Sequence, residues 1–397
     1  MAVTLAGVLG LAAGCTSAGG DDPVWQGGGS GGGATTPPPD PGPQLGATVT
    51  DPPANATGVP ALAQIAFTTT EATDAAVEVK TADGAAVAGK LTSDGKRWVP
   101  SAALKWGTAY TTTITVTGAD GKTATSTSTF TTMAKPEKLV RVTSQLGDGA
   151  VVGVAMPLII KFGRSIPKSF RDDVQRRMTV QSTPAQQGAW HWFSGSEVHY
   201  RPKTYWRSGT KLFYKVSARG VPMGAGWYGR SDITVDARVG AAVIMTVDNK
   251  TKRMTVTKDG KVLRRIPISL GKKSTPSSSG TMVVMEKLRK TIFDTFAELG
   301  PEEGYRTPID YAQRITWGGE FIHAAPWSVA SQGRRNVSHG CVNMSTANAS
   351  WLFGVSKVGD PVVIKGTERR LRTGNGWTAW NMSWSDYVAG SALPVAG

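Results

Sequence analysis

Cysteine and histidine are scarce in this chain of 397 residues, which has two cysteines and four histidines. So few cysteines cannot supply the disulfide framework of a small secreted domain, and no zinc-finger spacing is present. No apolar run reaches the roughly 18 residues of a membrane-spanning helix. The 48 glycines follow no Gly-x-y period, which excludes collagen, and the 13 tryptophans exclude a wholly disordered chain because they need burial. The length predicts two to four folded, turn-rich domains.

Acidic residues are also few. The formal net charge is +15, and it divides into −3 over residues 1–135 and +18 over the remainder. A basic body behind a mildly acidic N-terminal stretch favours attraction to an anionic cell envelope. The basic residues are dispersed, and no helix-turn-helix signal or RNA-binding aromatic motif is present, so no nucleic-acid partner is expected.

The first cysteine closes a short apolar segment near the N-terminus. Residues 1–15 end in the sequence Leu-Ala-Ala-Gly-Cys, and an apolar run that ends in small residues is typical of an export signal. The pattern resembles a bacterial lipobox, in which the cysteine becomes the lipidated first residue of the mature protein. We therefore expect Cys15 to carry a lipid anchor on the outer face of the cytoplasmic membrane, facing the periplasm and cell wall. An ordinary cleaved signal is the alternative.

Composition divides the rest of the chain, and the expected fold is mostly β. Residues 16–46 are rich in glycine, serine and proline and are expected to form a flexible tether. Residues 47–134 alternate Thr and Val between Asp-Gly turns, and residues 135–238 repeat part of their pattern, so two tandem immunoglobulin-like β-sandwiches are expected. Residues 239–366 form a third, β-rich unit. Residues 367–397 are a tryptophan-rich tail that is expected to pack back onto the body.

Within the third unit, short alternating segments predict strands. They cover residues 242–247, 254–258, 262–270, 281–285, 321–323 and 360–365. A helix is expected over residues 345–355, with Ser345 as its N-cap. Residues 286–315 have weak periodicity and are expected to form a long excursion of the kind that acts as a lid.

The second cysteine has an unusual neighbourhood. Cys341 lies in Ser-His-Gly-Cys-Val-Asn over residues 338–343, and two of the four histidines, His323 and His339, lie within 18 residues of it. A thiol with a pKa of about 8.5 is mostly protonated at neutral pH, so a nucleophilic cysteine needs an imidazole to ionise it. On geometry alone either histidine could be the base. Gly340 lets successive N–H groups turn toward one point, which suits an oxyanion.

Two other interpretations of these residues stay open. His323, His339 and Cys341 could ligate zinc, although a fourth ligand is hard to find because Cys15 is already assigned. Cys341 could also be a buried structural residue beside unrelated histidines.

The motif over residues 338–343, with a histidine 16 positions before its own histidine, resembles the signature of the L,D-transpeptidases with a YkuD-like catalytic domain. The order of lipobox, tether, two immunoglobulin-like domains, catalytic domain and tail is similar to the mycobacterial-type enzymes over nearly the whole chain. The resemblance implies that Cys341 is the nucleophile and His323 its general base, with the backbone carbonyl of Ala324 as third member. It further implies that the backbone N–H groups of His339, Gly340 and Cys341 form the oxyanion hole.

The resemblance also implies substrate-binding residues. Ser338 and Asn343 would hold the loop or the substrate. Gly304 and Tyr305 match flap residues that close over the acyl donor. Phe321 and Trp327 match residues that line the pocket.

The implied reaction joins peptidoglycan stem peptides. The thiolate attacks the carbonyl of the L-centre of diaminopimelate in a tetrapeptide stem and expels D-alanine. The diaminopimelate amine of a neighbouring stem then takes the acyl group, which gives a 3→3 cross-link without a metal or an organic cofactor. Carbapenems are the expected inhibitors, and the sandwiches are expected to be spacers.

Three other functions remain to be separated from this one. A sortase-like transpeptidase also places His before Cys but needs an Arg after the Cys, and a papain-like endopeptidase has the opposite order. A non-catalytic wall-binding scaffold is the alternative outside enzymes.

Overall fold

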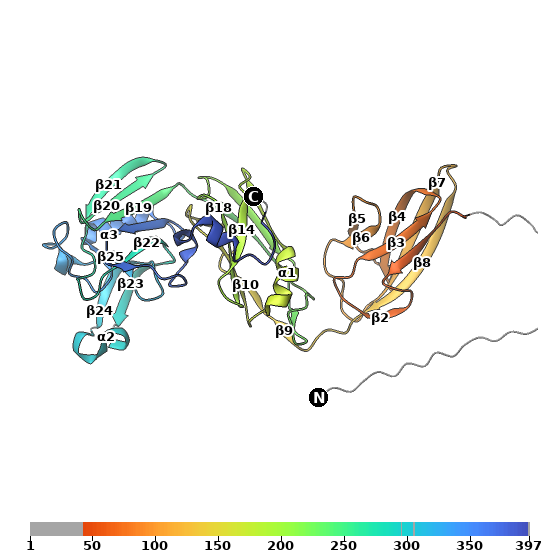
Figure 1. The fold of residues 1–397 in the computed structure, drawn as a ribbon, viewed down its shortest axis with the longest axis horizontal. Coiled ribbons are helices and arrows are strands. Elements are labelled where there is room, and N and C mark those ends of the chain that lie inside the picture. Colours follow the sequence, from red (N-terminus) through yellow and green to blue (C-terminus); the bar gives the residue numbers. More distant parts are fainter. Residues whose placement is uncertain (1–42, 295, 305, 396–397) are drawn as a thin grey trace, which may run out of the picture. The chain divides into compact units, whose positions relative to one another are not determined.

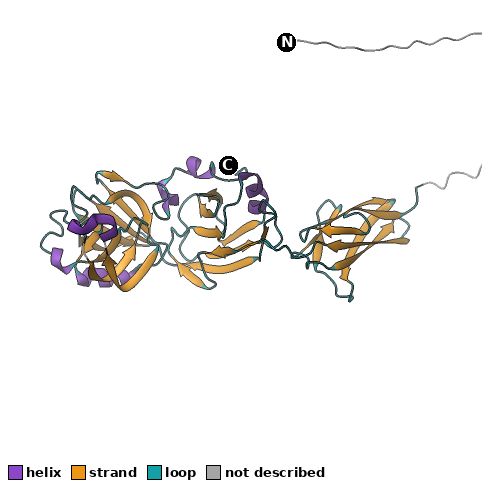
Figure 2. Cartoon of the chain, turned by 90° about the horizontal axis from the view of Figure 1, so that it is seen from below, coloured by secondary structure: helices purple, strands orange, loops and turns teal. Residues whose placement is uncertain are grey.

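The computed structural model describes residues 43–294, 296–304 and 306–395. Strands dominate its secondary structure, with short helices between them (Figure 2), which confirms the mostly β fold class. The expected signal peptide with Cys15, most of the expected tether, and Tyr305 lie outside the described residues. Within the described ranges, no helix is long and apolar enough to cross a membrane.

Residues 46–132 form two four-stranded sheets with the orders β1-β3-β6-β5 and β2-β8-β7-β4 (Figure 1). The strands are β1 (Gly46–Asp51), β2 (Ala56–Val59), β3 (Ile65–Thr70), β4 (Ala72–Thr81), β5 (Gly89–Leu91), β6 (Arg97–Pro100), β7 (Ala109–Gly118) and β8 (Thr123–Thr132). Residues along β7 alternate between partly exposed and buried, as a half-buried strand requires. The predicted Asp-Gly turns are confirmed, because Gly84, Gly95 and Gly121 have φ values of 84°, 66° and 78°.

Residues 139–239 form two further four-stranded sheets, with the orders β10-β12-β15-β14 and β11-β18-β16-β13, and a pair β17-β9. The strands are β9 (Leu139–Val140), β10 (Val142–Ser144), β11 (Ala150–Val152), β12 (Leu158–Phe162), β13 (Met178–Thr183), β14 (Gly188–Trp192), β15 (Glu197–Pro202), β16 (Lys211–Val216), β17 (Tyr228–Gly229) and β18 (Ile233–Val239). Trp206 is 2% exposed in their core and donates its indole N–H to the Met156 carbonyl at 2.9 Å.

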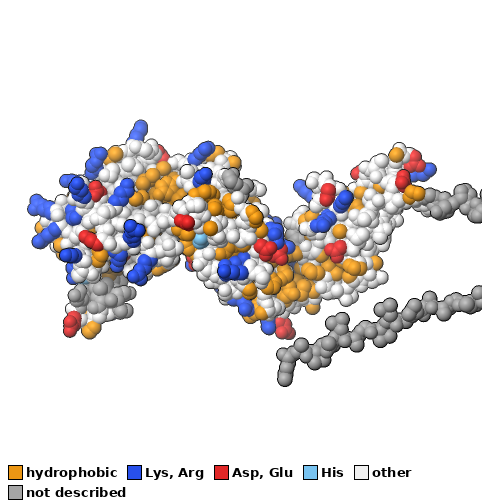
Figure 3. Space-filling model, viewed as in Figure 1, with side chains coloured by type: hydrophobic (Ala, Val, Ile, Leu, Met, Phe, Trp, Pro, Cys, Tyr) orange, Lys and Arg blue, Asp and Glu red, His pale blue; other side chains and the backbone are white. Residues whose placement is uncertain are grey.

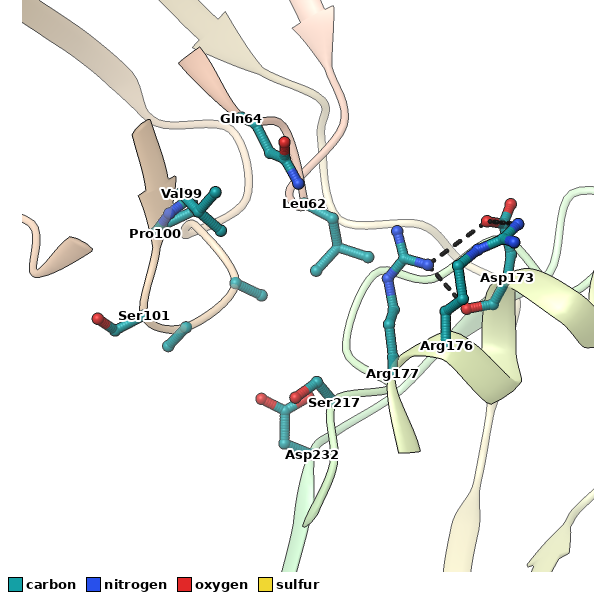
Figure 4. A pocket seen from close by; sticks show the side chains of 12 residues that line it. Leu62, Gln64, Val99, Pro100, Ser101, Asp173, Arg176, Arg177, Ser217 and Asp232 are labelled. Carbon is teal, nitrogen blue, oxygen red and sulfur yellow. Dashed lines mark hydrogen bonds and ion pairs between the residues drawn. The ribbon is translucent and has the colours of Figure 1, made fainter. Parts of the chain in front are cut away.

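A helix that the alternation pattern does not predict, α1 (Lys168–Arg176), lies between β12 and β13. Val174 is buried against the sheets. Arg176 pairs with Asp172 at 2.7 Å. Figure 4 shows Asp173 beside Arg176, with which it pairs at 3.2 Å, and Arg177, which donates to the Asp173 carbonyl at 2.7 Å. These pairs, three and four positions apart, are the local contacts that a helix allows and a strand does not.

From residue 243 onward the chain forms a six-stranded sheet, β21-β20-β19-β27-β22-β28, and a four-stranded sheet, β23-β24-β25-β26. The elements are β19 (Val243–Asp248), β20 (Arg253–Lys258), β21 (Lys261–Pro267), β22 (Ser278–Val283), β23 (Glu286–Asp294), α2 (Phe296–Glu303), β24 (Arg306–Arg314), β25 (Phe321–Ala324), η1 (Pro326–Ser328), β26 (Val342–Met344), α3 (Thr346–Val355), β27 (Pro361–Lys365) and β28 (Arg369–Arg370). The six strands predicted for this part are confirmed within a few residues at each end. The helix is confirmed with its cap, since Ser345 Oγ accepts the Asn348 N–H at 3.3 Å.

Residues 286–315 differ from the predicted excursion. They form a long antiparallel hairpin in which β23 pairs with β24 from Glu286 opposite Arg314 to Asp294 opposite Arg306. Most residues of β23 are exposed or half-buried, so apolar and polar residues do not alternate and the strand leaves no clear periodicity.

The tail packs back onto the body, as expected. It contains η2 (Thr378–Asn381) and α4 (Trp384–Val388). The Trp380 indole N–H donates to the Ala155 carbonyl and the Tyr387 hydroxyl donates to the His199 carbonyl, both at 2.7 Å. The guanidinium of Arg201 lies 4.2–5.2 Å from the ring centroids of Trp380, Trp384 and Tyr387, so cation–π contacts join β15 to the tail.

Lysine and arginine side chains are spread over the visible face of the chain and do not gather in one patch (Figure 3). This dispersion agrees with the sequence-based expectation.

Candidate active site

Two parallel strands bring the motif residues together. In the pairing of β25 with β26, Ile322 lies opposite Val342 and His323 lies opposite Asn343. Ile322 and Val342 are both fully buried, so the hydrophobic core fixes this register. Cys341 directly precedes β26 and therefore lies beside the strand that carries His323.

The backbone before Cys341 is held by side chains and neighbouring strands. Ser338 Oγ donates to the Cys341 carbonyl at 2.7 Å and accepts the Gly340 N–H at 3.2 Å. Ser277 Oγ donates to the Gly340 carbonyl at 2.6 Å. Gly340 has a φ of 132°, a conformation that residues with a side chain rarely adopt. One of the three amides expected in the oxyanion hole, that of Gly340, therefore donates within the loop.

A cavity of about 460 Å³ opens beside this loop. It is lined by Thr307, His323, Trp327, Val337, Ser338, His339, Cys341 and Asn343. Six of the residues singled out from the sequence thus share one cavity, and a seventh, Gly340, lies in the loop at its wall. Trp327 is 62% exposed at this site, so its ring is available to a ligand.

Phe321 is not among the lining residues, although the resemblance implied that it would be. It is 5% exposed and packs behind the cavity in a cluster with Phe293, Ile309, Ala312 and the partly buried Cys341. The ring centroids of Phe321 and Phe293 are 4.6 Å apart. Phe321 therefore supports the cysteine from behind.

His323 is oriented by its own strand. The ring is 4% exposed, and Nδ1 lies 2.7 Å from the Ala324 carbonyl, which is the contact that the resemblance implied. A carbonyl can only accept, so Nδ1 carries the proton and the lone pair is on Nε2. Burial lowers the pKa of His323 to about 4, against smaller raising effects of the Ala324 carbonyl and the Asn343 side chain. The imidazole is therefore neutral at pH 7.

The Cys341 thiol also favours its neutral, protonated form. Burial raises the pKa of the Cys341 thiol to about 12, the Glu320 charge raises it further, and the Phe321 backbone lowers it. Sγ lies 3.7 Å from the Gly319 carbonyl. Burial therefore disfavours the charged form of both the thiol and the imidazole.

Two charged residues near Gly340, Glu320 and Arg369, belong to no pattern that sequence analysis could single out. They form an ion pair, and Glu320 also accepts from Ser278. They are 49 positions apart and belong to no motif, so only the fold brings them together.

For the zinc alternative, no group of three or more His, Cys, Asp or Glu suited to a metal ion occurs in the part of the chain that the structure describes.

Comparison with protein families agrees with the two kinds of domain. Residues 56–222 match the bacterial Ig domain, and residues 242–364 match the L,D-transpeptidase catalytic domain.

Individual relatives extend the match over most of the chain. L,D-transpeptidase 2 of Mycobacterium tuberculosis is 36% identical over 354 residues, which cover 88% of this chain and 85% of that protein. L,D-transpeptidase 5 of the same organism is 34% identical, over 78% of this chain and 69% of that protein. The solved structure of an L,D-transpeptidase in complex with imipenem is 34% identical, with a TM-score of 0.50, and the match covers 58% of this chain and all of that one. The chain belongs to the L,D-transpeptidase family.

Proposed function

We propose that this L,D-transpeptidase forms 3→3 cross-links between diaminopimelate residues of peptidoglycan stem peptides, with Cys341 as nucleophile and His323 as general base. The observation that carries the proposal is that both side chains line one cavity while the Ala324 carbonyl holds His323 in the tautomer of a base.

Because the resting thiol and imidazole are both neutral, proton transfer accompanies attack. Sγ bonds to the donor carbonyl carbon while His323 Nε2 takes the thiol proton. The tetrahedral oxyanion is stabilised by backbone amides of the loop, those of His339 and Cys341, with Gly340 supplying the backbone conformation. His323 then gives the proton to the leaving nitrogen, the C–N bond breaks, and D-alanine leaves from a thioester.

In the second half of the reaction the amine of a neighbouring diaminopimelate attacks the thioester. His323 accepts the proton of the amine and returns it to the sulfur as the C–S bond breaks, which restores the thiol. A thioester keeps the acyl group activated, so the exchange of one amide for another needs no external energy source and no cofactor.

The remaining cavity residues suit substrate binding. Trp327 offers an exposed aromatic face, and the buried Asn343 donates to Ser328 Oγ at 3.4 Å. Ser338 acts through the loop that it holds. Tyr305 and its neighbour Gly304 are assigned to the flap over the acyl donor from the sequence alone.

We infer that the enzyme works at the cell wall. The bacterial Ig match and the mycobacterial relatives support a place in the envelope. Lipidation at Cys15 would anchor the chain to the membrane, residues 16–46 would form the tether, and the sandwiches over residues 47–134 and 135–238 would act as spacers. The catalytic part would then be residues 239–366.

A sortase-like transpeptidase and a non-catalytic scaffold are disfavoured by the catalytic-domain match over residues 242–364. Intact-mass analysis after incubation with imipenem tests the choice. We expect one covalent adduct, mapped to the peptide that contains Cys341, and none in a folded Cys341→Ala variant. Tetrapeptide stems should yield cross-linked dimers and free D-alanine, whereas sorting-signal peptides should not react. An unmodified wild-type Cys341 together with binding to sacculi would contradict the proposal.

A further inference from the structure

An ion pair between a buried carboxylate, Glu320, and a half-exposed guanidinium, Arg369, lies near the loop over residues 338–341, called here the nucleophile loop. Glu320, which directly precedes β25, is 3% exposed, and its Oε1 accepts from Arg369 of β28. The same oxygen accepts the Ser278 N–H at 3.1 Å and the Ser278 hydroxyl at 2.9 Å. Its Oε2 is buried and has no hydrogen-bond partner among the described residues. In the described part of the chain, the cation that pairs with this carboxylate is Arg369.

The pair is the nearest group to the side of Gly340 where a side chain would point. A Cβ built on Gly340 would lie 3.6 Å from Glu320 Cγ, 3.7 Å from Arg369 Nη2 and 3.9 Å from Glu320 Oε1. The two side chains therefore face the Gly340 Cα, with room for about one carbon atom between them and the loop. Neither residue lines the cavity.

Several charged or titratable groups surround the Cys341 thiol. From β25 comes His323, which is neutral at pH 7, and from the loop itself His339. From β24 comes Arg314, which lies 4.4 Å over the Phe321 ring and pairs with Glu286 at 3.1 Å. Glu320 is the carboxylate whose charge opposes ionisation of the thiol.

We propose that Glu320 and Arg369 are positioning residues for the transpeptidase reaction: together they lie beside the loop at Gly340, and Arg369 offsets part of the negative charge that Glu320 places near the Cys341 sulfur. The pair acts through the loop and touches no substrate. The inference rests on the proposed role of Cys341 as nucleophile. It also predicts, for each variant, whether alkylation of the Cys341 thiol becomes faster or slower.

The test is the rate at which iodoacetamide, a small neutral reagent, alkylates Cys341 in the full chain at one fixed pH near 8. At this pH the thiolate is a minor species, so the rate follows its population. Arg369→Gln leaves the carboxylate unpaired and should slow alkylation by about three- to tenfold; Glu320→Gln leaves the cation unpaired and should speed it by a similar factor. The double variant should return to within about twofold of the wild type, because both charges are gone.

Arg370→Gln is the matched control, since Arg370 is the exposed neighbour of Arg369 on the same strand. It should leave the rate unchanged. Arg369→Lys keeps the charge and should restore most of the rate lost in Arg369→Gln. Peptide mapping separates Cys341 from Cys15.

A purely structural role predicts that both single variants change the rate in the same direction or not at all, and either result overturns the proposal. If Glu320→Gln does not fold, the comparison of Arg369→Gln with Arg369→Lys decides, and equal rates contradict the proposal. A different result is that the two single variants change the alkylation rate in opposite directions in a protein that imipenem fails to acylate. That result would support the effect of Glu320 and Arg369 on the thiol and would refute the proposed function instead.

Discussion

His323 is fixed by its neighbour in the chain: Nδ1 hydrogen bonds to the Ala324 carbonyl at 2.7 Å, at a site where the ring is 4% exposed. A carbonyl cannot change its protonation state, unlike the carboxylate that orients histidine in many hydrolases. The tautomer of His323 is therefore set over the whole working pH range. The contact also explains why the side chain of residue 324 can be a methyl group.

The low pKa of His323 predicts the acid limb of the reaction. A general base must be neutral, and burial lowers the pKa of His323 to about 4. The rate of acylation by imipenem should thus stay level from about pH 8 to 5.5 and fall only as the pH approaches 4. Stopped-flow fluorescence across this range measures it, with circular dichroism as the control for folding. An acid limb centred near the ordinary imidazole pKa would show that the resting base is solvated.

Ser338→Ala tests the bridge that holds the nucleophile loop. The hydroxyl donates to the Cys341 carbonyl and accepts the Gly340 N–H, and the side chain is 6% exposed. Losing both contacts should cost about 1–3 kcal/mol of stability and slow acylation by tenfold or more, because the loop amides are no longer held in place. Thermal unfolding and acylation kinetics measure the two effects. The control is Ser274→Ala, at an exposed position in the same part of the chain, which should change neither the stability nor the acylation rate. An unchanged acylation rate in Ser338→Ala would contradict the role of the two hydrogen bonds.

Asp360 predicts how stability depends on pH. Burial raises the pKa of this carboxyl to about 7, against the lowering effects of the Lys357 N–H and of the Lys357 and Lys287 charges. The folded state thus binds a proton that the unfolded state releases near its ordinary pKa of 3.8. Stability from this group is present below that value and is lost as the pH rises through 7.

Asp360→Asn should remove this loss. The variant should be about 1–3 kcal/mol more stable than the wild type at pH 8 and similar to it at pH 4, as measured by urea unfolding at both values. Asp310→Asn, an exposed carboxylate on β24, is the control and should leave the pH dependence unchanged. A parallel decline of wild type and Asp360→Asn with rising pH would assign the effect to another group.

Arg201→Ala tests how the tail is held. The guanidinium is buried, lies over three aromatic rings of the tail, and donates to the Ala379 carbonyl at 3.1 Å. Removing it should lower stability by about 2–4 kcal/mol, because ring contacts are lost and carbonyls are left without a donor. Thermal unfolding and limited proteolysis of the tail report the change, with the exposed Arg207→Ala as control. A tail that stays resistant to proteolysis in Arg201→Ala would contradict this account.

Local chemistry explains what could be predicted from the sequence. Asp-Gly turns, the Ser345 cap and the buried strands each follow from a few adjacent residues, and the constellation of His323 and Cys341 lies within one short stretch. What could not be predicted depends on distant residues. The β23–β24 hairpin has little burial to create a pattern, and Glu320 meets Arg369 only because β28 adds to the edge of the sheet beside β22. The resemblance implies that Phe321 lines the cavity, but its ring packs into the cluster with Phe293, because a match of residue type does not say which side of the strand faces the cavity.

The pairing of β25 with β26 has a consequence for insertions and deletions. His323 and Cys341 are aligned by a backbone ladder that can shift only in whole-residue steps, and a one-residue step would turn the apolar partners Ile322 and Val342 out of the core. The exposed stretch near Arg334, in the connection between the two strands, can therefore change in length without altering how the two reacting side chains meet. Such a change would leave the spacing between His323 and Cys341 as the strand pairing sets it.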